Sequence, residues 1–146
     1  MKYKFKDQAA HRGPRLTDKT SGEAVAQAER VLIVDDEMSI RMLLTRILKD
    51  WGYGVKHVGS ALEALDVMAA EPADILFCDV TMPDHDGLWL AEQVHAKWPR
   101  TAIIMATAHD DPDTVRSSRA VGATAYITKP FRQYQLREAL ERVSGR

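Results

Sequence analysis

The sequence predicts an α/β fold in which five helices cover both faces of a five-stranded parallel sheet. Short apolar runs alternate with stretches of helical periodicity, and strands that alternate with helices run parallel to one another. Residues 31–34 and 75–78 are apolar throughout, as expected for strands that are buried on both faces. Five such units suit a doubly wound sheet of strand order 2-1-3-4-5, in which the first and third strands lie side by side.

The individual elements can be placed in order from residue 31. Strands are expected at residues 31–34, 55–58, 75–78, 102–106 and 125–127. Helices are expected at residues 40–51, 61–70, 88–98, 113–121 and 131–143, of which 113–121 is the weakest. The first, third and fifth helices carry apolar residues three or four positions apart, as amphipathic helices do. These residues are Ile40, Leu43, Leu44, Ile47, Leu48 and Trp51, then Leu88, Ala91, Val94 and Trp98, and finally Leu136, Leu140 and Val143.

The first 29 residues are expected to form a tail, and residues 30–146 a single domain. The tail lacks sustained periodicity and contains Gly13, Pro14 and Gly22, so we expect it to be flexible or to hold one short helix. That helix would span residues 23–29, where alanines favour helix and Ser21 could cap its start.

Composition excludes several classes of protein. A chain of 146 residues with 45% hydrophobic content supports one core, and no apolar run approaches the roughly eighteen residues of a membrane span. The single cysteine, Cys78, cannot form an internal disulfide, and the polar N-terminus does not resemble a secretory signal, so a cytoplasmic location is expected. Residues 31–146 carry thirteen basic and seventeen acidic side chains, which argues against direct nucleic-acid binding.

Polar residues follow four of the five expected strands. Asp35 and Asp36 follow the first strand, Asp79 the third, Thr107 the fourth, and Lys129 the fifth. The expected topology brings them together, and three neighbouring carboxylates would raise one another's pKa unless a cation lay between them. Oxygen ligands without histidine or cysteine suit Mg²⁺, which leaves coordination positions for a phosphoryl oxygen. The crevice is therefore expected to bind Mg²⁺ and phosphate.

Four segments give the chain a family resemblance: VLIVDDE, ILFCDVTMPDHDG, IIMATAHDD and AYITKPF. In this order and at this spacing they closely resemble the signatures of bacterial response-regulator receiver domains, in particular chemotaxis-regulator-like single domains. The resemblance covers residues 31–143. It implies a flavodoxin-like fold and a two-component phosphorelay, in which a sensor histidine kinase or histidine phosphotransfer protein is the phosphoryl donor.

The resemblance also implies roles for the acidic residues. Asp79 would be the phosphoacceptor, whose carboxylate attacks a phosphohistidine of the partner. Asp36 and Asp79 would bind Mg²⁺ directly, together with the backbone carbonyl of Thr81, and Asp35 would act through coordinated water. Capping of the following helix is the alternative for Asp35 and Asp36, and one of them could serve both purposes.

The remaining roles concern recognition of the phosphoryl group and output. The resemblance implies that Lys129 pairs with the acceptor and then with a phosphoryl oxygen, that the Lys129–Pro130 peptide is cis, and that the Thr107 hydroxyl turns inward. Tyr126 would then exchange an exposed for a buried position and reshape the face of the fourth helix, fifth strand and fifth helix. Thr81 and His109 would tune hydrolysis of the phosphoryl group. No outside substrate is implied, so the chain is not expected to be an enzyme beyond its own phosphorylation and dephosphorylation.

Other readings of the sequence remain open. A Mg²⁺-dependent aspartyl phosphohydrolase would usually carry a DxD pattern after the first strand and a cap domain, neither of which is evident. A flavodoxin-like cofactor carrier is disfavoured by the acidic residues 35–37 after that strand. The domain could also be part of a longer regulator or hybrid kinase, with an unknown output domain or partner. No zinc site is expected, because the histidines lack ligand spacing, and Cys78 is expected in the core.

Overall fold

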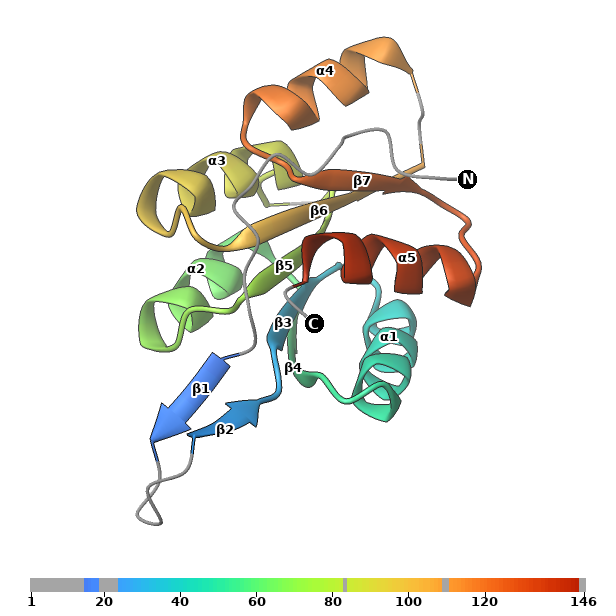
Figure 1. Ribbon diagram of the computed structural model, residues 1–146. Coiled ribbons are helices and arrows are strands. Elements are labelled where there is room, and N and C mark those ends of the chain that lie inside the picture. Colours follow the sequence, from blue (N-terminus) through green and yellow to red (C-terminus); the bar gives the residue numbers. More distant parts are fainter. Residues whose placement is uncertain (1–14, 19–23, 83, 109–110, 145–146) are drawn as a thin grey trace.

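The structure is a computed structural model that describes residues 15–18, 24–82, 84–108 and 111–144 (Figure 1). Five parallel strands form the sheet: β3 (Arg30–Val34), β4 (Gly54–Val58), β5 (Ile75–Asp79), β6 (Ala102–Thr107) and β7 (Ala125–Thr128). Their order across the sheet is β4-β3-β5-β6-β7. This is the predicted order 2-1-3-4-5, so the α/β prediction is confirmed.

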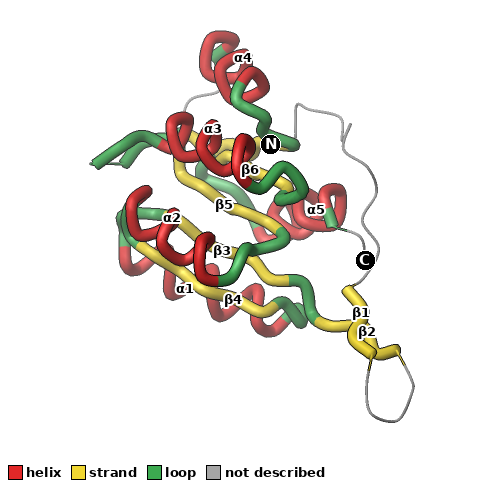
Figure 2. Tube along the Cα trace, turned by 90° about the vertical axis from the view of Figure 1, so that its left-hand side faces the viewer, coloured by secondary structure: helices red, strands yellow, loops and turns green. Residues whose placement is uncertain are grey.

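Five helices follow the strands: α1 (Met38–Asp50), α2 (Ala61–Ala70), α3 (Gly87–Lys97), α4 (Pro112–Ala120) and α5 (Gln133–Val143). Figures 1 and 2 show the sheet between two helical layers, with α2, α3 and α4 on one face and α1 and α5 on the other. Two cores result, because alternate residues of each strand point to opposite faces. Leu32, Leu76 and Cys78 pack under α2 and α3, whereas Ile33, Phe77 and Ile104 pack under α1 and α5.

Strand β5 places the predicted acceptor. All five of its residues are buried, and it lies between β3 and β6 in the middle of the sheet. Burial on both faces explains why the sequence of this strand is apolar throughout until Asp79. Since Val34 pairs with Cys78 in the register of β3 and β5, the residues that follow β3 emerge beside Asp79 at the carboxyl edge of the sheet.

Local caps determine where the helices begin and end. Ser60, Asp86 and Asp111 accept hydrogen bonds from the backbone amides of the first turns of α2, α3 and α4. Gly52 and Gly122 follow α1 and α4 with φ angles of 96° and 99°, a left-handed conformation that favours glycine. No described helix combines the length and the apolar character that a bilayer span requires.

The expected helix in the N-terminal segment is wrong for residues 24–27. These residues form strand β2 (Ala24–Gln27), which pairs antiparallel with β1 (Arg15–Asp18). The hairpin projects beyond β3 and β4 (Figure 1). Helix propensities differ by only about 0.7 kcal/mol among ordinary residues, so hydrogen bonds to a second strand override them. Ser21 and Glu23 lie outside the described residues.

Glu29 belongs to the folded domain, although the sequence placed it at the end of the tail. Its side chain is buried, and its carboxylate accepts a hydrogen bond from the hydroxyl of Ser144, which follows α5. Its backbone carbonyl accepts a hydrogen bond from Gly54, at the start of β4. The chain is therefore anchored to the domain one residue before β3 begins.

Candidate functional site

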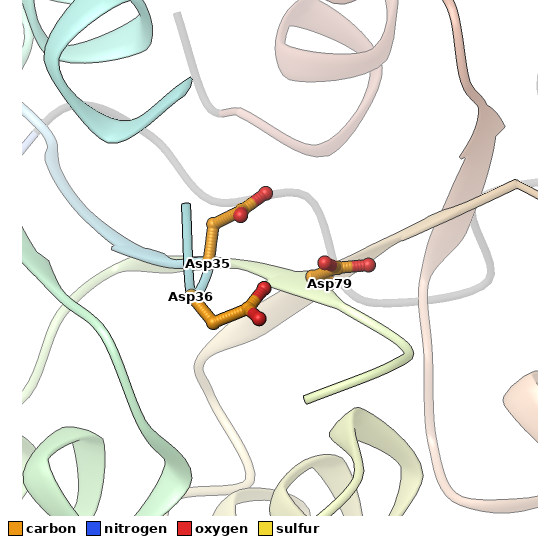
Figure 3. Close-up of side chains that lie close together, drawn as sticks. All are labelled: Asp35, Asp36 and Asp79. Atoms are coloured by element: carbon orange, nitrogen blue, oxygen red, sulfur yellow. The ribbon is translucent and has the colours of Figure 1, made fainter. Parts of the chain in front are cut away.

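Three carboxylates meet at the carboxyl edge of the sheet. Asp35 follows β3, Asp36 comes next, and Asp79 ends β5. Ligand atoms from the three side chains lie within 4.8 Å of one another (Figure 3). Asp35 and Asp79 are buried, whereas Asp36 is exposed and opens the cluster to solvent. The structure thus brings together the three acidic residues that the sequence singled out.

Lys129 is the cation that faces this cluster. Its Nζ lies 3.2 Å from Oδ2 of Asp35 and 3.3 Å from Oδ2 of Asp79. Its backbone amide donates a hydrogen bond of 2.7 Å to the carbonyl of Thr107, which joins the end of β7 to the end of β6. The Lys129–Pro130 peptide bond is cis, as the family resemblance implied. One ammonium thus serves two carboxylates.

Burial and charge act in opposite directions on Asp79. Burial raises the pKa of the Asp79 carboxyl and the neighbouring charge of Asp35 raises it further, while Lys129 lowers it, and the net shift is upward. Burial of the Lys129 ammonium disfavours its charge, but Asp79 and Asp35 outweigh that effect and raise the pKa of Lys129. Burial also raises the pKa of the Cys78 thiol well above its usual range, as expected for an unreactive core cysteine. Asp79 is therefore held in a site short of positive charge.

The donor atoms fit a hard divalent cation. All three side chains offer carboxylate oxygens, and a magnesium ion prefers oxygen ligands while keeping several waters. Both oxygens of Asp35 have other partners, since Oδ1 accepts the amide of Glu37 at 2.9 Å and Oδ2 faces Lys129. Asp79 is engaged in a similar way, since its Oδ2 faces Lys129 at 3.3 Å and its Oδ1 accepts the Thr81 amide at 3.4 Å, so the exposed Asp36 is the most accessible of the three carboxylates. The Asp35 bond to the Glu37 amide lies just before α1, whose N-cap residue Glu37 makes no side-chain capping hydrogen bond.

The loop between β5 and α3 passes close to Asp79. A Cβ atom on Gly87 would come within 2.1 Å of the Asp79 carbonyl oxygen, so only glycine fits there without a backbone shift. The amide of Thr81 approaches Oδ1 of Asp79 at 3.4 Å. Asp84 accepts the amides of Ala61 and Leu62 at 3.2 and 3.1 Å, which ties this loop to the start of α2.

The two expected switch residues lie on adjacent strands. Thr107 ends β6, one position beyond the residue that pairs with Asp79, and it is buried. Tyr126 pairs with Met105 in the register of β6 and β7 and lies in the core beneath α3 and α4 with 1% exposure. The Tyr126 side chain is therefore buried in this structure. His109 lies outside the described residues.

Two residues near the site carried no signal in the sequence. Asp84 stands in the loop after β5, and Arg41 lies on α1, where a charged residue is unremarkable on a half-exposed helix. Arg41 donates a hydrogen bond to the backbone carbonyl of Asp35. Such contacts depend on how helices and loops meet in space, and periodicity does not predict them.

Comparisons with known proteins agree with this geometry. The family model described as the response regulator receiver domain matches residues 31–141. The chain is 30% identical over 114 residues to sporulation initiation phosphotransferase F of Bacillus subtilis, covering 78% of this chain and 92% of that protein. It is 39% identical over 99 residues to the DNA-binding transcriptional regulator NtrC of Klebsiella pneumoniae, covering 68% of this chain but 21% of that protein.

Solved structures show the same arrangement of helices and strands. The chemotaxis response regulator CheY4 of Vibrio cholerae matches with a TM-score of 0.77 and 34% identity, covering 80% of this chain and 99% of that one. A BeF3-activated DrrB receiver domain matches with a TM-score of 0.73 and 26% identity, covering 80% of this chain and 97% of that one. The chain thus spans nearly all of some relatives and about a fifth of NtrC.

Proposed function

The chain belongs to the response regulator receiver domain family, and from this premise we propose that it accepts a phosphoryl group on the carboxylate of Asp79. The observation that carries the proposal is the position of Asp79 at the end of the central strand, between two further carboxylates and the ammonium of Lys129. An ionised carboxylate can attack phosphorus in line and form an acyl phosphate, while the donor's leaving group departs on the opposite side.

A bound Mg²⁺ would offset negative charge on the transferring group. We propose that Asp36 and Asp79 bind it directly with the Thr81 carbonyl, and that Asp35 acts through coordinated water. Burial supports this division, because the Asp35 side chain is 1% exposed and that of Asp79 12%, while Asp36 is exposed, so Asp35 is the least accessible of the three carboxylates. Exposure of Asp36 leaves the site open to solvent and to an incoming donor.

Lys129 and Thr107 are proposed to recognise the phosphoryl group. The ammonium that now pairs with Asp79 at 3.3 Å would move its hydrogen bonds to a phosphoryl oxygen, where charge-assisted bonds are strong. Thr107 lies one residue beyond the strand partner of Asp79, so its hydroxyl is in a position to supply a second donor.

The proposed donor is a sensor histidine kinase or a histidine phosphotransfer protein, and we propose a cytoplasmic location for the chain. Similarity to sporulation initiation phosphotransferase F over 92% of that protein supports a phosphorelay partner. Output is proposed to depend on the face of α4, β7 and α5, where Thr107 and Tyr126 lie close to the surface helices. We propose no turnover of an outside substrate, because reaction at Asp79 consumes the acceptor until its phosphoryl group is lost.

Acetyl phosphate with Mg²⁺ tests the proposal. The wild-type chain is expected to gain one phosphoryl group by intact mass, and Asp79→Asn none, because an amide is not a nucleophile of this kind. Asp66→Asn, which changes an exposed aspartate of α2, is the matched control and should be labelled like wild type. Labelling of Asp79→Asn, or equal labelling in EDTA, would show that the acceptor or the metal requirement is misassigned. Repeated turnover of a generic phosphomonoester would favour the phosphohydrolase instead.

A further inference from the structure

Arg41 joins the start of α1 to the ends of two strands. Its Nη1 donates a hydrogen bond of 2.8 Å to the backbone carbonyl of Asp35, and its Nε donates one of 3.2 Å to Nδ1 of His57 on β4. Its Nη2 contacts the sulfur of Met38 at 3.3 Å. The half-buried guanidinium thus spans the loop that carries Asp35 and Asp36 and the neighbouring edge strand.

The contacts of Arg41 differ from those of a surface arginine. Within the part of the chain that the structure describes, no ion pair includes Arg41, and its oxygen acceptor is a main-chain carbonyl. Gly59, just beyond β4, leaves room for the guanidinium of Arg41, because a Cβ atom on residue 59 would lie 2.9 Å from Nη1 of Arg41. The guanidinium is therefore fixed by its hydrogen bond to the Asp35 carbonyl and by the space that Gly59 leaves for it.

His57 supports this geometry from the other side. Nδ1 of His57 is the acceptor of the hydrogen bond from Nε of Arg41, and a ring nitrogen accepts only through its lone pair. The fork of Arg41 can bond to Asp35 and His57 at once, which the single ammonium of a lysine does not reproduce. His57 in turn fixes the plane of the guanidinium against β4.

The backbone of Asp35 is held by hydrogen bonds on both sides, directly before the proposed metal ligand Asp36. Its amide donates to the carbonyl of Val58 at 3.2 Å, and its carbonyl accepts from Arg41. The next residue is Asp36, and among the residues that the structure describes no side-chain hydrogen bond holds its carboxylate. The direction of the Asp36 carboxylate therefore follows from how firmly the preceding peptide is held.

We propose that Arg41 is a positioning residue for the phosphorylation site: it fixes the loop of Asp35 and Asp36 for metal binding, and His57 fixes Arg41. This inference rests on the proposed function and adds a residue outside the acidic cluster to it. Groups that orient metal ligands from outside the coordination sphere typically change metal affinity 10- to 100-fold when they are removed.

The test compares Mg²⁺ affinity in matched variants of helix α1. We expect Arg41→Met to raise the dissociation constant for Mg²⁺, followed by tryptophan fluorescence, by about tenfold, the lower end of such effects. Arg46→Met removes an exposed arginine five positions along α1 and should leave the dissociation constant unchanged. At saturating Mg²⁺ the phosphorylation rate of Arg41→Met should approach that of wild type, because its nucleophile is intact.

Changes at His57 distinguish positioning from a general loss of stability. His57→Gln retains a side-chain acceptor for Arg41 and should keep near-wild-type affinity, whereas His57→Leu should weaken Mg²⁺ binding. Because His57 acts through Arg41, the double variant Arg41→Met/His57→Leu should be no weaker than Arg41→Met alone. Should Arg41→Met fail to fold, Gly59→Ala displaces the tip of the guanidinium and should itself weaken Mg²⁺ binding.

Two results would overturn the inference. They are equal Mg²⁺ affinities for Arg41→Met and Arg46→Met, and fully additive effects of Arg41→Met and His57→Leu. Both are separate from failure of the proposed function, which would appear as wild-type protein that acetyl phosphate does not label at Asp79.

Discussion

Removal of the Lys129 charge should destabilise the metal-free protein more than removal of the charge of any exposed lysine. Its ammonium is the cation closest to two buried carboxylates, at 3.2 Å from Asp35 and 3.3 Å from Asp79. Lys129→Met keeps most of the side-chain volume and removes the charge, which leaves both carboxylates without this partner. The perturbation therefore isolates the electrostatic contribution of the ion pairs.

The magnitude follows from burial. Loss of one partner of a fully buried ion pair costs about 3–5 kcal/mol, because the remaining charge is uncompensated. The side chain of Asp35 is 1% exposed and that of Asp79 12%, but that of Lys129 is 23% exposed, so water replaces part of the lost interaction. We expect the free energy of unfolding to fall by about 2–3 kcal/mol at pH 7.

Urea unfolding in EDTA, compared with unfolding in saturating Mg²⁺, measures this change. Lys56→Met is the matched control, since Lys56 pairs with Glu71 at the surface and exposed pairs contribute about 0–1 kcal/mol. Mg²⁺ should reduce the deficit of Lys129→Met, because it supplies positive charge to the same carboxylates. A loss below about 0.5 kcal/mol in EDTA, close to that of a surface pair, would refute the proposed dependence of the carboxylates on Lys129.

The pH dependence of this deficit has a definite sign. The folded-state pKa of Lys129 lies above its ordinary 10.5, so its stabilisation is fully present below pH 10.5 and is lost as the pH rises through the folded value. Lys129 also lowers the pKa of Asp79, so the carboxyl in Lys129→Met binds its proton at higher pH. The deficit should therefore shrink as the pH falls from 7 towards 4 and the Asp79 charge is neutralised.

Three further outcomes are expected. Asp79→Asn should raise the free energy of unfolding in EDTA at pH 7. The raised pKa of the Asp79 carboxyl favours the folded state below pH 3.8, and this contribution is lost as the pH rises through the folded pKa. Denaturation at pH 7 and at pH 4 shows whether the gain fades on acidification. Gly87→Ala should destabilise by about 1–3 kcal/mol in urea, because its Cβ would meet the backbone of Asp79, whereas Gly54→Ala, whose nearest neighbour lies at 3.6 Å, should not. Thr107→Ala should reduce the amide NMR shifts that beryllofluoride with Mg²⁺ causes over α4, while binding at Asp79 stays detectable; a full response would exclude the Thr107 to Tyr126 coupling.

Buried strands and strand ends were the predictable part of this molecule. Strand β5 is apolar because both of its faces are covered, and that same burial makes Asp79 conspicuous when it ends the run. The strand order then brought Asp35 and Asp36 next to it, as the register of β3 and β5 confirms. For these features the chemistry of single residues and a topological rule were sufficient.

Contacts that depend on three-dimensional placement were not predictable. The pairing of β1 with β2 joins residues up to twelve positions apart, and no local pattern in either strand identifies its partner. Arg41 reads as an ordinary polar residue of an amphipathic helix until the end of β4 is seen beside it. Gly59 likewise has no signal of its own, since its role is to leave room for a side chain from another element.

Burial and a neighbouring carboxylate raise the pKa of Asp79, so ligands that supply positive charge at this site can influence the domain. Burial and Asp35 favour the neutral acid, whereas the proposed metal binding and nucleophilic attack both require the carboxylate. Any ligand that supplies positive charge there therefore stabilises the folded, ionised state by mass action. Coupling between two sites is reciprocal and typically amounts to about 1–3 kcal/mol. It follows that an output partner whose affinity rises tenfold when Mg²⁺ and beryllofluoride occupy the site must raise the joint affinity for those ligands by the same factor, so partner binding can be detected at Asp79 itself.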